Sequence, residues 1–161
     1  GHALPRSKQK ILIAMSAAYR AQQEREMGFR RVLRSEFPHL SIDERVIADD
    51  VPETVYRQLS RYFDARERPT AIYNVAGANR GVARALETAG IARDTVFVGH
   101  ELTEASQMLL ESGTMDYVIS HDVSVEVARA AQWILRFQEG IVDEPASTSI
   151  LVHTKYNCRN G

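Results

Sequence analysis

Short apolar runs alternate along this chain with longer segments in which apolar residues recur every three or four positions. Short runs bounded by turn residues are typical of buried strands, and the longer period is typical of amphipathic helices. Strands are predicted over residues 10–15, 40–48, 70–75, 95–99, 116–120 and 149–154, with helices over 19–37, 49–63, 79–90, 103–113 and 124–140. This alternation predicts an α/β fold, a three-layer αβα sandwich whose mostly parallel sheet carries helices on both faces.

The central unit of this pattern is residues 69–90, which read as an apolar strand, a small-residue loop and a helix. The loop is followed directly by Asn79 and Arg80. Ligands of open α/β sheets bind at the carboxyl ends of the strands, where these two polar residues are expected. The loop has the form Gly-x-x-x-Gly, which also permits a phosphate at the helix N-terminus but is a weak signal alone.

The helix predicted over residues 19–37 has an apolar face that becomes polar toward the end beside the preceding strand. The polar residues there are Gln22, Gln23 and Arg25. Either this end of the helix frays into solvent, or one of these three side chains reaches a ligand.

Four helical patterns are preceded by polar residues that are expected to act as N-caps: Ser16, Asp49 with Asp50, Thr103 and Ser124. The paired aspartates also permit a metal or phosphoacceptor site. The proline that follows them favours a helix start instead, because proline is well placed in the first turn of a helix.

Length and composition fit one globular domain of 161 residues, with 44% apolar and 25% charged residues. A net charge of −1 gives no electrostatic case for binding a nucleic-acid backbone. The single Cys158 excludes an internal disulfide. No apolar run approaches the roughly 18 residues of a membrane span, and no secretory signal pattern opens the chain. Residues 1–8 are interpreted as an expression-derived segment or linker, so the missing signal carries little weight.

Three predicted strands end in pairs of polar residues: Asn79-Arg80, His100-Glu101 and His121-Asp122. Together these side chains offer hydrogen-bond donors and acceptors. A sugar hydroxyl both donates and accepts, so a mixed polar site of this kind suits a small polyhydroxylated molecule.

Two histidines and two carboxylates in such positions also permit a metal site or a general acid–base pair. No catalytic, zinc-binding or dinucleotide-binding motif supports that alternative. A purely structural role for each histidine is a further alternative. We expect no enzymatic activity, no cofactor and no metal.

The order of these segments resembles a known family. The segments are YNVAGANRGVARALETAG, TVFVGHELTEASQMLLESGTMDYVISHD and SILVHTKYN, and the Met-Gly-Phe of the first helix is similar to a Gly-aromatic pair common there. Over residues 10–157 they resemble the effector-binding core of the lac/galactose repressor family, which shares its fold with type I periplasmic sugar-binding proteins. The resemblance implies a periplasmic-binding-protein-like type I lobe, in which residues 9–161 form mainly the C-terminal lobe of a two-lobed clamshell.

The same resemblance implies which residues bind the ligand. Asn79, Glu101 and His121 stand where the family commonly has Asn, Asp and Gln. Gln23 stands where many members have a sugar-binding Arg, and Arg80 is typical of a subgroup. We expect these five residues to bind a small sugar or polyol, whose identity the three replacements leave open.

A helix-turn-helix headpiece and an N-terminal lobe are also implied, and neither is in this sequence. Residues 123–143 are expected to pack in that lobe in an intact protein. Without it, we predict that the helix over 124–139, with Val127, Ala131 and Ile134 on its apolar face, repacks on its own sheet or is buried against a second copy of the chain.

These expectations describe the sugar-sensing domain of a cytoplasmic, DNA-binding transcriptional regulator or repressor. It would bind operator DNA only through the absent headpiece, act as a homodimer and contact no membrane. Effector binding would then change the affinity for DNA. The alternative is a periplasmic sugar-binding protein of a transport system, which has the same fold and a permease as its partner.

Overall fold

The structure is a computed structural model that describes residues 9–16, 19–66, 68–142, 144 and 148–159, with only the backbone described at 43–45. The expected segment 1–8 lies outside the described residues. The elements, in chain order, are β1 (Lys10–Met15), α1 (Arg20–Glu36), β2 (Ser41–Ile47), α2 (Pro52–Ala65), β3 (Ala71–Asn74), α3 (Asn79–Thr88), β4 (Val96–His100), α4 (Glu104–Ser112), β5 (Tyr117–His121), α5 (Val123–Gln138) and β6 (Ile150–His153). They follow the predicted alternation, and the α/β fold with a mostly parallel sheet is confirmed.

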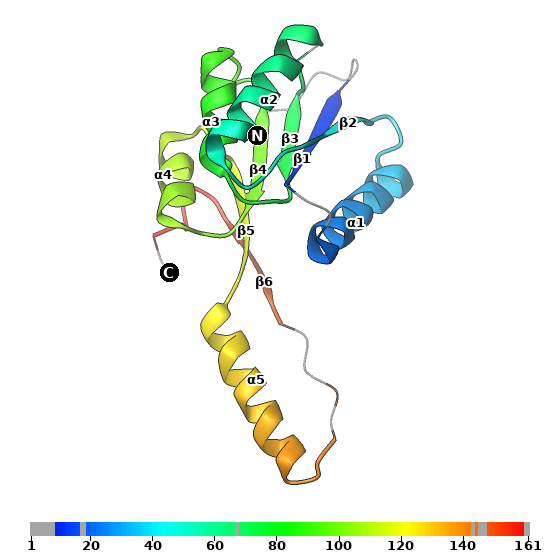
Figure 1. Ribbon diagram of the computed structural model, residues 1–161, viewed down its shortest axis with the longest axis vertical. Coiled ribbons are helices and arrows are strands. Elements are labelled where there is room, and N and C mark those ends of the chain that lie inside the picture. Colours follow the sequence, from blue (N-terminus) through cyan, green and yellow to red (C-terminus); the bar gives the residue numbers. More distant parts are fainter. Residues whose placement is uncertain (1–8, 17–18, 67, 143, 145–147, 160–161) are drawn as a thin grey trace.

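The strands form one sheet in the order β2-β1-β3-β4-β5-β6 (Figure 1). β1 to β5 run parallel, and β6 pairs antiparallel with β5. The chain first moves from β1 outward to β2 and then continues on the other side of β1 with β3. This reversal between β1 and β3 is the type of position where open α/β sheets bind ligands, at the carboxyl ends of the strands.

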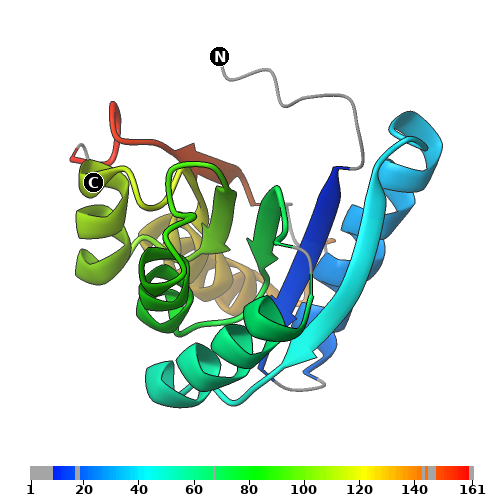
Figure 2. The same cartoon turned by 90° about the horizontal axis from the view of Figure 1, so that it is seen from above.

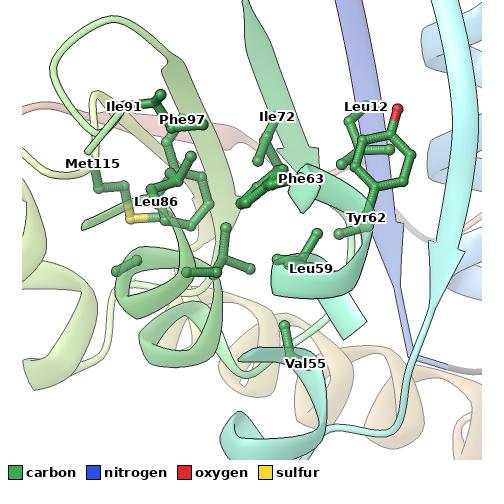
Figure 3. Packing of buried hydrophobic residues seen from close by; sticks show 14 of the residues in the cluster. Leu12, Val55, Leu59, Tyr62, Phe63, Ile72, Leu86, Ile91, Phe97 and Met115 are labelled. Atoms are coloured by element: carbon green, nitrogen blue, oxygen red, sulfur yellow. The ribbon is translucent and has the colours of Figure 1, made fainter. Parts of the chain in front are cut away.

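The core has two layers, one on each face of the sheet. Side chains alternate along a strand, so Leu12 packs toward α2 and α3 whereas Ile13 packs toward α1. The α2–α3 layer is the larger and centres on Leu59, Ile72 and Phe97, all fully buried (Figure 3). Figure 2 shows α1 on the opposite side of the sheet from α2 and α3. The three layers therefore exist, but the α1 layer covers only part of its face.

Two helix starts show where the capping signal works and where it misleads. Thr103 is the N-cap of α4, as predicted, and its side chain accepts a hydrogen bond from the backbone N–H of Ser106. The prediction for Ser124 is wrong, because Asp122 caps α5 by accepting from the N–H of Val125. Aspartate and serine are both good capping residues, and Asp122 and Ser124 stand two positions apart. Because β5 ends at His121, the helix already begins after Asp122.

The expected caps of the first two helices are also wrong. α1 begins after Tyr19 and α2 after Val51, and neither has a side-chain cap. Asp49 instead accepts from the N–H of Val51, and Asp50 accepts from the N–H of Gly77 at 3.0 Å. The aspartates thus organise the turn before α2 and join it to the loop after β3.

α5 does not repack on its own sheet, so that alternative is wrong. None of its residues is buried, and Figure 1 shows it beyond the end of the sheet. Only Asp122 separates β5 from α5, whereas a helix that turns back onto its sheet needs a connection of about two to six residues. The helix therefore leaves in the direction of the strand. Burial against a second copy stays a prediction.

Among the described residues no helix combines the length and the apolar character that crossing a bilayer requires.

At Gly81 the backbone of α3 lies directly against the start of α2. A Cβ atom there would overlap the backbone carbonyl of Pro52, which cannot swing aside as a flexible side chain can. We expect Gly81→Ala to lower the free energy of unfolding by about 1–3 kcal/mol, despite alanine's better helix propensity. Urea unfolding of both proteins measures the change.

The matched control is Gly28→Ala in α1, where a Cβ would have no neighbour within 4 Å. That variant should have a free energy of unfolding about 0.5–1 kcal/mol higher, since alanine loses less conformational entropy than glycine on entering a helix. Equal effects of the two substitutions would contradict the close packing of α3 on α2.

Candidate functional site

The carboxyl ends of β3, β4 and β5 bring together polar residues from segments far apart in the sequence. We call Arg25, Tyr73, His100, Glu101 and His121 the edge cluster. Tyr73, His100 and His121 belong to the strands themselves, Glu101 follows β4 directly, and Arg25 comes from α1. Parallel strands place these positions at one edge, where the sequence predicted a binding site.

Arg25 connects the two sides of the reversal between β1 and β3. Its Nη1 donates to the carbonyl oxygen of Val75 at 3.0 Å, and its Nη2 lies 3.7 Å from Oε1 of Glu101. The guanidinium is therefore held at the sheet edge by one hydrogen bond and beside a carboxylate. At this end of α1, Arg25 thus reaches the residues that follow β3 and β4.

Tyr73 and His100 form a buried pair. The Tyr73 hydroxyl lies 2.9 Å from Nε2 of His100, and the Tyr73 ring also packs 4.6 Å from that of Phe29 in α1. Burial raises the pKa of Tyr73, and burial together with the charges of Arg25 and His121 lowers the pKa of His100 to about 4. His100 is thus neutral near pH 7, and its tautomer decides which of the two groups donates in this hydrogen bond. The Nδ1 atom of His100 has no hydrogen-bond partner among the described residues.

Glu101 has a left-handed backbone with φ of 67°. This conformation is uncommon for a residue with a Cβ and is often found at functional positions. It is held because the Glu101 N–H donates to Ile119 at 2.9 Å and the Glu101 carbonyl accepts from the N–H of Thr103 at 2.9 Å. The carboxylate remains half-exposed at the edge.

His121 ends β5 beside the start of α5. Its Nδ1 lies 3.2 Å from Oε1 of Glu126, and this contact is an ion pair only when the His121 ring is protonated. His100 and His121 end the neighbouring parallel strands β4 and β5, so the two residues lie at the same edge of the sheet.

Asn79 lies at this edge as predicted, but its side chain is buried and engaged. Its Nδ2 donates to the carbonyl of His100 at 3.0 Å and to Oγ of Ser106 at 3.2 Å, and its Oδ1 accepts from Asn74 at 2.7 Å. These bonds join the ends of β3 and β4 to α4. Asn79 therefore positions the strand end that carries Glu101, and its direct contact with a ligand stays a prediction.

The other two expected ligand residues, Gln23 and Arg80, are both exposed. Their contact with a ligand stays a prediction. Gln22 is buried, and it exchanges hydrogen bonds with Ser16 that close the connection between β1 and α1. Gln22 thus has a structural role.

Tyr73 and Asn74 gave no signal in the sequence, because both lie within an apolar run that reads as core. Tyr73 faces the α1 layer together with His100 in the neighbouring strand. To place Tyr73 beside His100, one must know which residues of β3 and β4 pair with each other, and this pairing is known only from the structure.

The loop after β3 is not a free anion site. The N–H of Gly77 already donates to the Asp50 carboxylate, whose charge would repel a phosphate. The described residues hold no group of three or more His, Cys, Asp or Glu side chains arranged for a metal ion. A hollow of about 630 Å³ lies at the opposite edge of the sheet, between the starts of β4 and β5 and the turn after β6.

The edge cluster combines one guanidinium, one half-exposed carboxylate and neutral imidazole. These groups donate and accept hydrogen bonds, and the carboxylate can take two hydroxyl donors at once. The cluster also contains the Tyr73 hydroxyl, which shares a hydrogen bond with the His100 ring. These groups can recognise a polar molecule by hydrogen bonds.

Comparison with known proteins agrees with this geometry. Residues 1–140 match the family model described as periplasmic binding protein domain. Among curated protein sequences there is no match.

Solved structures with the same fold include three sugar- or polyol-related binding proteins. One is an ABC transporter solute-binding protein from Agrobacterium vitis bound with α-D-tagatopyranose, with 17% identity, a TM-score of 0.83, and coverage of 93% of this chain and 51% of that one. A second is GanP, a glucose-galactose binding protein from Geobacillus stearothermophilus, with 17% identity, a TM-score of 0.83, and coverage of 93% of this chain and 54% of that one. A third is an ABC transporter solute-binding protein from Bacillus halodurans with bound myo-inositol, with 18% identity, a TM-score of 0.80, and coverage of 95% of this chain and 54% of that one.

At these identities the structures show a shared fold, and the chain spans about half their length. The family match covers residues 1–140, which is most of the chain. The chain thus belongs to the periplasmic binding protein domain family.

Proposed function

We propose that this chain is the sugar- or polyol-binding lobe of a solute-binding protein that serves a membrane transporter. The observation that carries the proposal is the edge cluster, where Arg25, Glu101 and His121 offer donors and acceptors at the carboxyl ends of the strands. The similar structures are bound with, or named for binding, tagatopyranose, glucose, galactose and myo-inositol, all polyhydroxylated molecules. The half-exposed Glu101 carboxylate is the strongest acceptor of the cluster for such hydroxyls.

The transport function is favoured over the regulator function expected from sequence. Two of the three similar structures described above are named as ABC transporter solute-binding proteins, and the third is named as a sugar-binding protein. The regulator interpretation includes transcription regulation, DNA binding through a headpiece and a cytoplasmic location. Sequencing the gene upstream of residue 3 separates the two, since a helix-turn-helix supports the regulator and a cleavable signal supports transport.

The site is open on one side, since the edge cluster comes from one lobe. Half of a two-walled site offers fewer hydrogen bonds, so we expect weak binding by a single chain. Nuclear magnetic resonance titration with D-galactose, D-allose, D-arabinose and myo-inositol suits this range, because it reports weak binding and the residues affected.

Glu101→Gln is expected to weaken sugar binding by about 10- to 100-fold, because a charged hydrogen-bond acceptor is replaced by a neutral one of the same shape. The matched control is Glu104→Gln, at the exposed start of α4. This control should bind as the unaltered chain does. Equal binding by both variants would remove Glu101 from the site, and a chain that binds none of the four molecules would contradict the proposed function.

A further inference from the structure

The charges at the carboxyl edge of the sheet bear on which sugars the edge cluster accepts. Arg25 brings the one guanidinium of the cluster. Its Nη1 donates to the carbonyl of Val75 at 3.0 Å, and its Nη2 lies 3.7 Å from the carboxylate of Glu101. The positive charge of Arg25 is thus already beside a carboxylate of the protein. A ligand carboxylate or phosphate has to compete with Glu101 for this guanidinium.

The histidines of the cluster add little positive charge. His100 is buried, and this burial, followed by the charges of Arg25 and His121, lowers the pKa of His100 to about 4. Its ring is therefore neutral near pH 7. The Nδ1 atom of His121 lies 3.2 Å from the carboxylate of Glu126, so any proton that this ring takes up is also beside a negative charge.

Helix N-termini attract anions, because their free N–H groups and their dipole favour negative charge. The helices α3, α4 and α5 all begin at this edge, and side chains of the chain itself occupy their starts. Asp50 accepts from the N–H of Gly77 before α3, Thr103 caps α4 and Asp122 caps α5. Arg80 in the first turn of α3 is exposed, so water and salt screen its charge.

Glu101 is the least compensated charge of the edge cluster. Its carboxylate is half-exposed, and the distance of 3.7 Å to Arg25 is too long for a direct hydrogen bond. Such a carboxylate accepts from hydroxyl groups and repels other carboxylates. At a separation of about 4 Å, repulsion between two unit charges changes an affinity about fivefold even in bulk water, and more beside protein.

We propose that Glu101 makes the edge cluster selective for uncharged sugars and polyols, and that it rejects acidic and phosphorylated sugars by repulsion between like charges. This selection rests on the sugar binding proposed above. The same carboxylate then supplies both the attraction for hydroxyl groups and the repulsion that specific sites often need against similar molecules. Arg25 does not rescue an anionic ligand, because Glu101 already compensates its charge.

The first test compares molecules that share a ring and differ in charge. Nuclear magnetic resonance titration at pH 7 is carried out with D-galactose against D-galacturonate, and with myo-inositol against myo-inositol 1-phosphate. We expect the unaltered chain to bind each neutral molecule at least about 10-fold more tightly than its anionic counterpart. Equal or tighter binding of the anionic molecules overturns the selection.

Glu101→Gln should move the two affinities in opposite directions. Galactose should bind more weakly, as stated above. Galacturonate should bind at least about 10-fold more tightly than it does to the unaltered chain, because the repulsion is gone and Arg25 is no longer compensated. If both affinities fall together, Glu101 is a hydroxyl acceptor without a role in charge selection, and the proposal is overturned.

Glu104→Gln is the matched control, because it removes the same charge from an exposed position at the start of α4. It should leave both affinities unchanged. A gain in galacturonate binding of the same size in this control would assign the effect to the net charge of the chain rather than to Glu101, which also overturns the selection.

The part of Arg25 is tested by combining Arg25→Gln with Glu101→Gln. The gain in galacturonate binding should disappear, and circular dichroism checks that the double variant is folded. A second measurement needs no change at Arg25. Raising the salt concentration from about 0.01 M to about 1 M should weaken galacturonate binding to Glu101→Gln and leave galactose binding unchanged. A gain that persists in the folded double variant, or that salt does not affect, overturns the charge mechanism.

Failure of the selection and failure of the proposed function give different results. Binding of neutral and anionic molecules with equal affinity overturns only the selection. Binding of none of the four molecules also overturns the selection. If D-allose and D-arabinose do not bind either, the proposed function fails with it.

Discussion

Phe97→Ala is expected to lower the free energy of unfolding by about 3–5 kcal/mol, the largest single effect in this chain. The ring is fully buried at the centre of the α2–α3 layer, and Figure 3 shows it among Leu86, Ile91 and Met115. These neighbours come from α3 and from the connections before β4 and β5, so they cannot collapse together into the space. For a chain of this length the melting temperature should fall by about 6–20 °C.

The matched control is Phe37→Ala at the exposed end of α1, where the same atoms are removed from a half-solvated position. That variant should change stability by less than about 1 kcal/mol. Calorimetry on both variants measures the difference. A similar loss in the two would show that the α2–α3 layer does not carry most of the stability.

Acidification is expected to destabilise the chain through His100. Its pKa is lowered from 6.5 to about 4 in the folded state, first by burial and then by the charges of Arg25 and His121. Between these two values the unfolded chain binds a proton that the folded chain does not. The His100 contribution to stability is therefore fully present above pH 6.5 and is lost as the pH falls, by about 1.4 kcal/mol for each pH unit until near pH 4.

His100→Gln separates this contribution from that of the carboxylates, because glutamine does not titrate. The variant is expected to be less stable near neutral pH, where the Tyr73 hydrogen bond is altered. The difference in unfolding free energy between the two proteins should shrink as the pH falls from 6.5 to 4. If the difference in unfolding free energy between the two proteins is the same at all pH values, His100 is not held neutral by the fold.

The fold was predictable because local pattern and tertiary structure agree. Except for β2, each strand is a short apolar run, and α1 to α4 each have an apolar face that packs toward the sheet. α5 is the exception. It has the same pattern, but the length of the β5–α5 connection decides where it packs, and that length depends on Asp122 rather than Ser124 acting as the cap.

The site was predictable only in part. Glu101 and His121 could be found because polar residues at the end of an apolar strand stand out in a sequence. The buried partners could not. Tyr73 joins His100 through the register of neighbouring strands, and Asn79 is occupied by hydrogen bonds to residues 5 to 27 positions away. Such pairings arise from the packing of whole elements and leave no local signal.

The absence of any buried residue in α5 divides a single chain into two cooperative units. Isolated helices of this length are only marginally stable in water, since most helical stability in proteins comes from packing. In one unpaired chain α5 therefore opens and re-forms at low free energy, whereas the amides of β1, β3 and β4 open only with the whole lobe. The lobe that carries the edge cluster keeps its structure while the helix beside His121 melts.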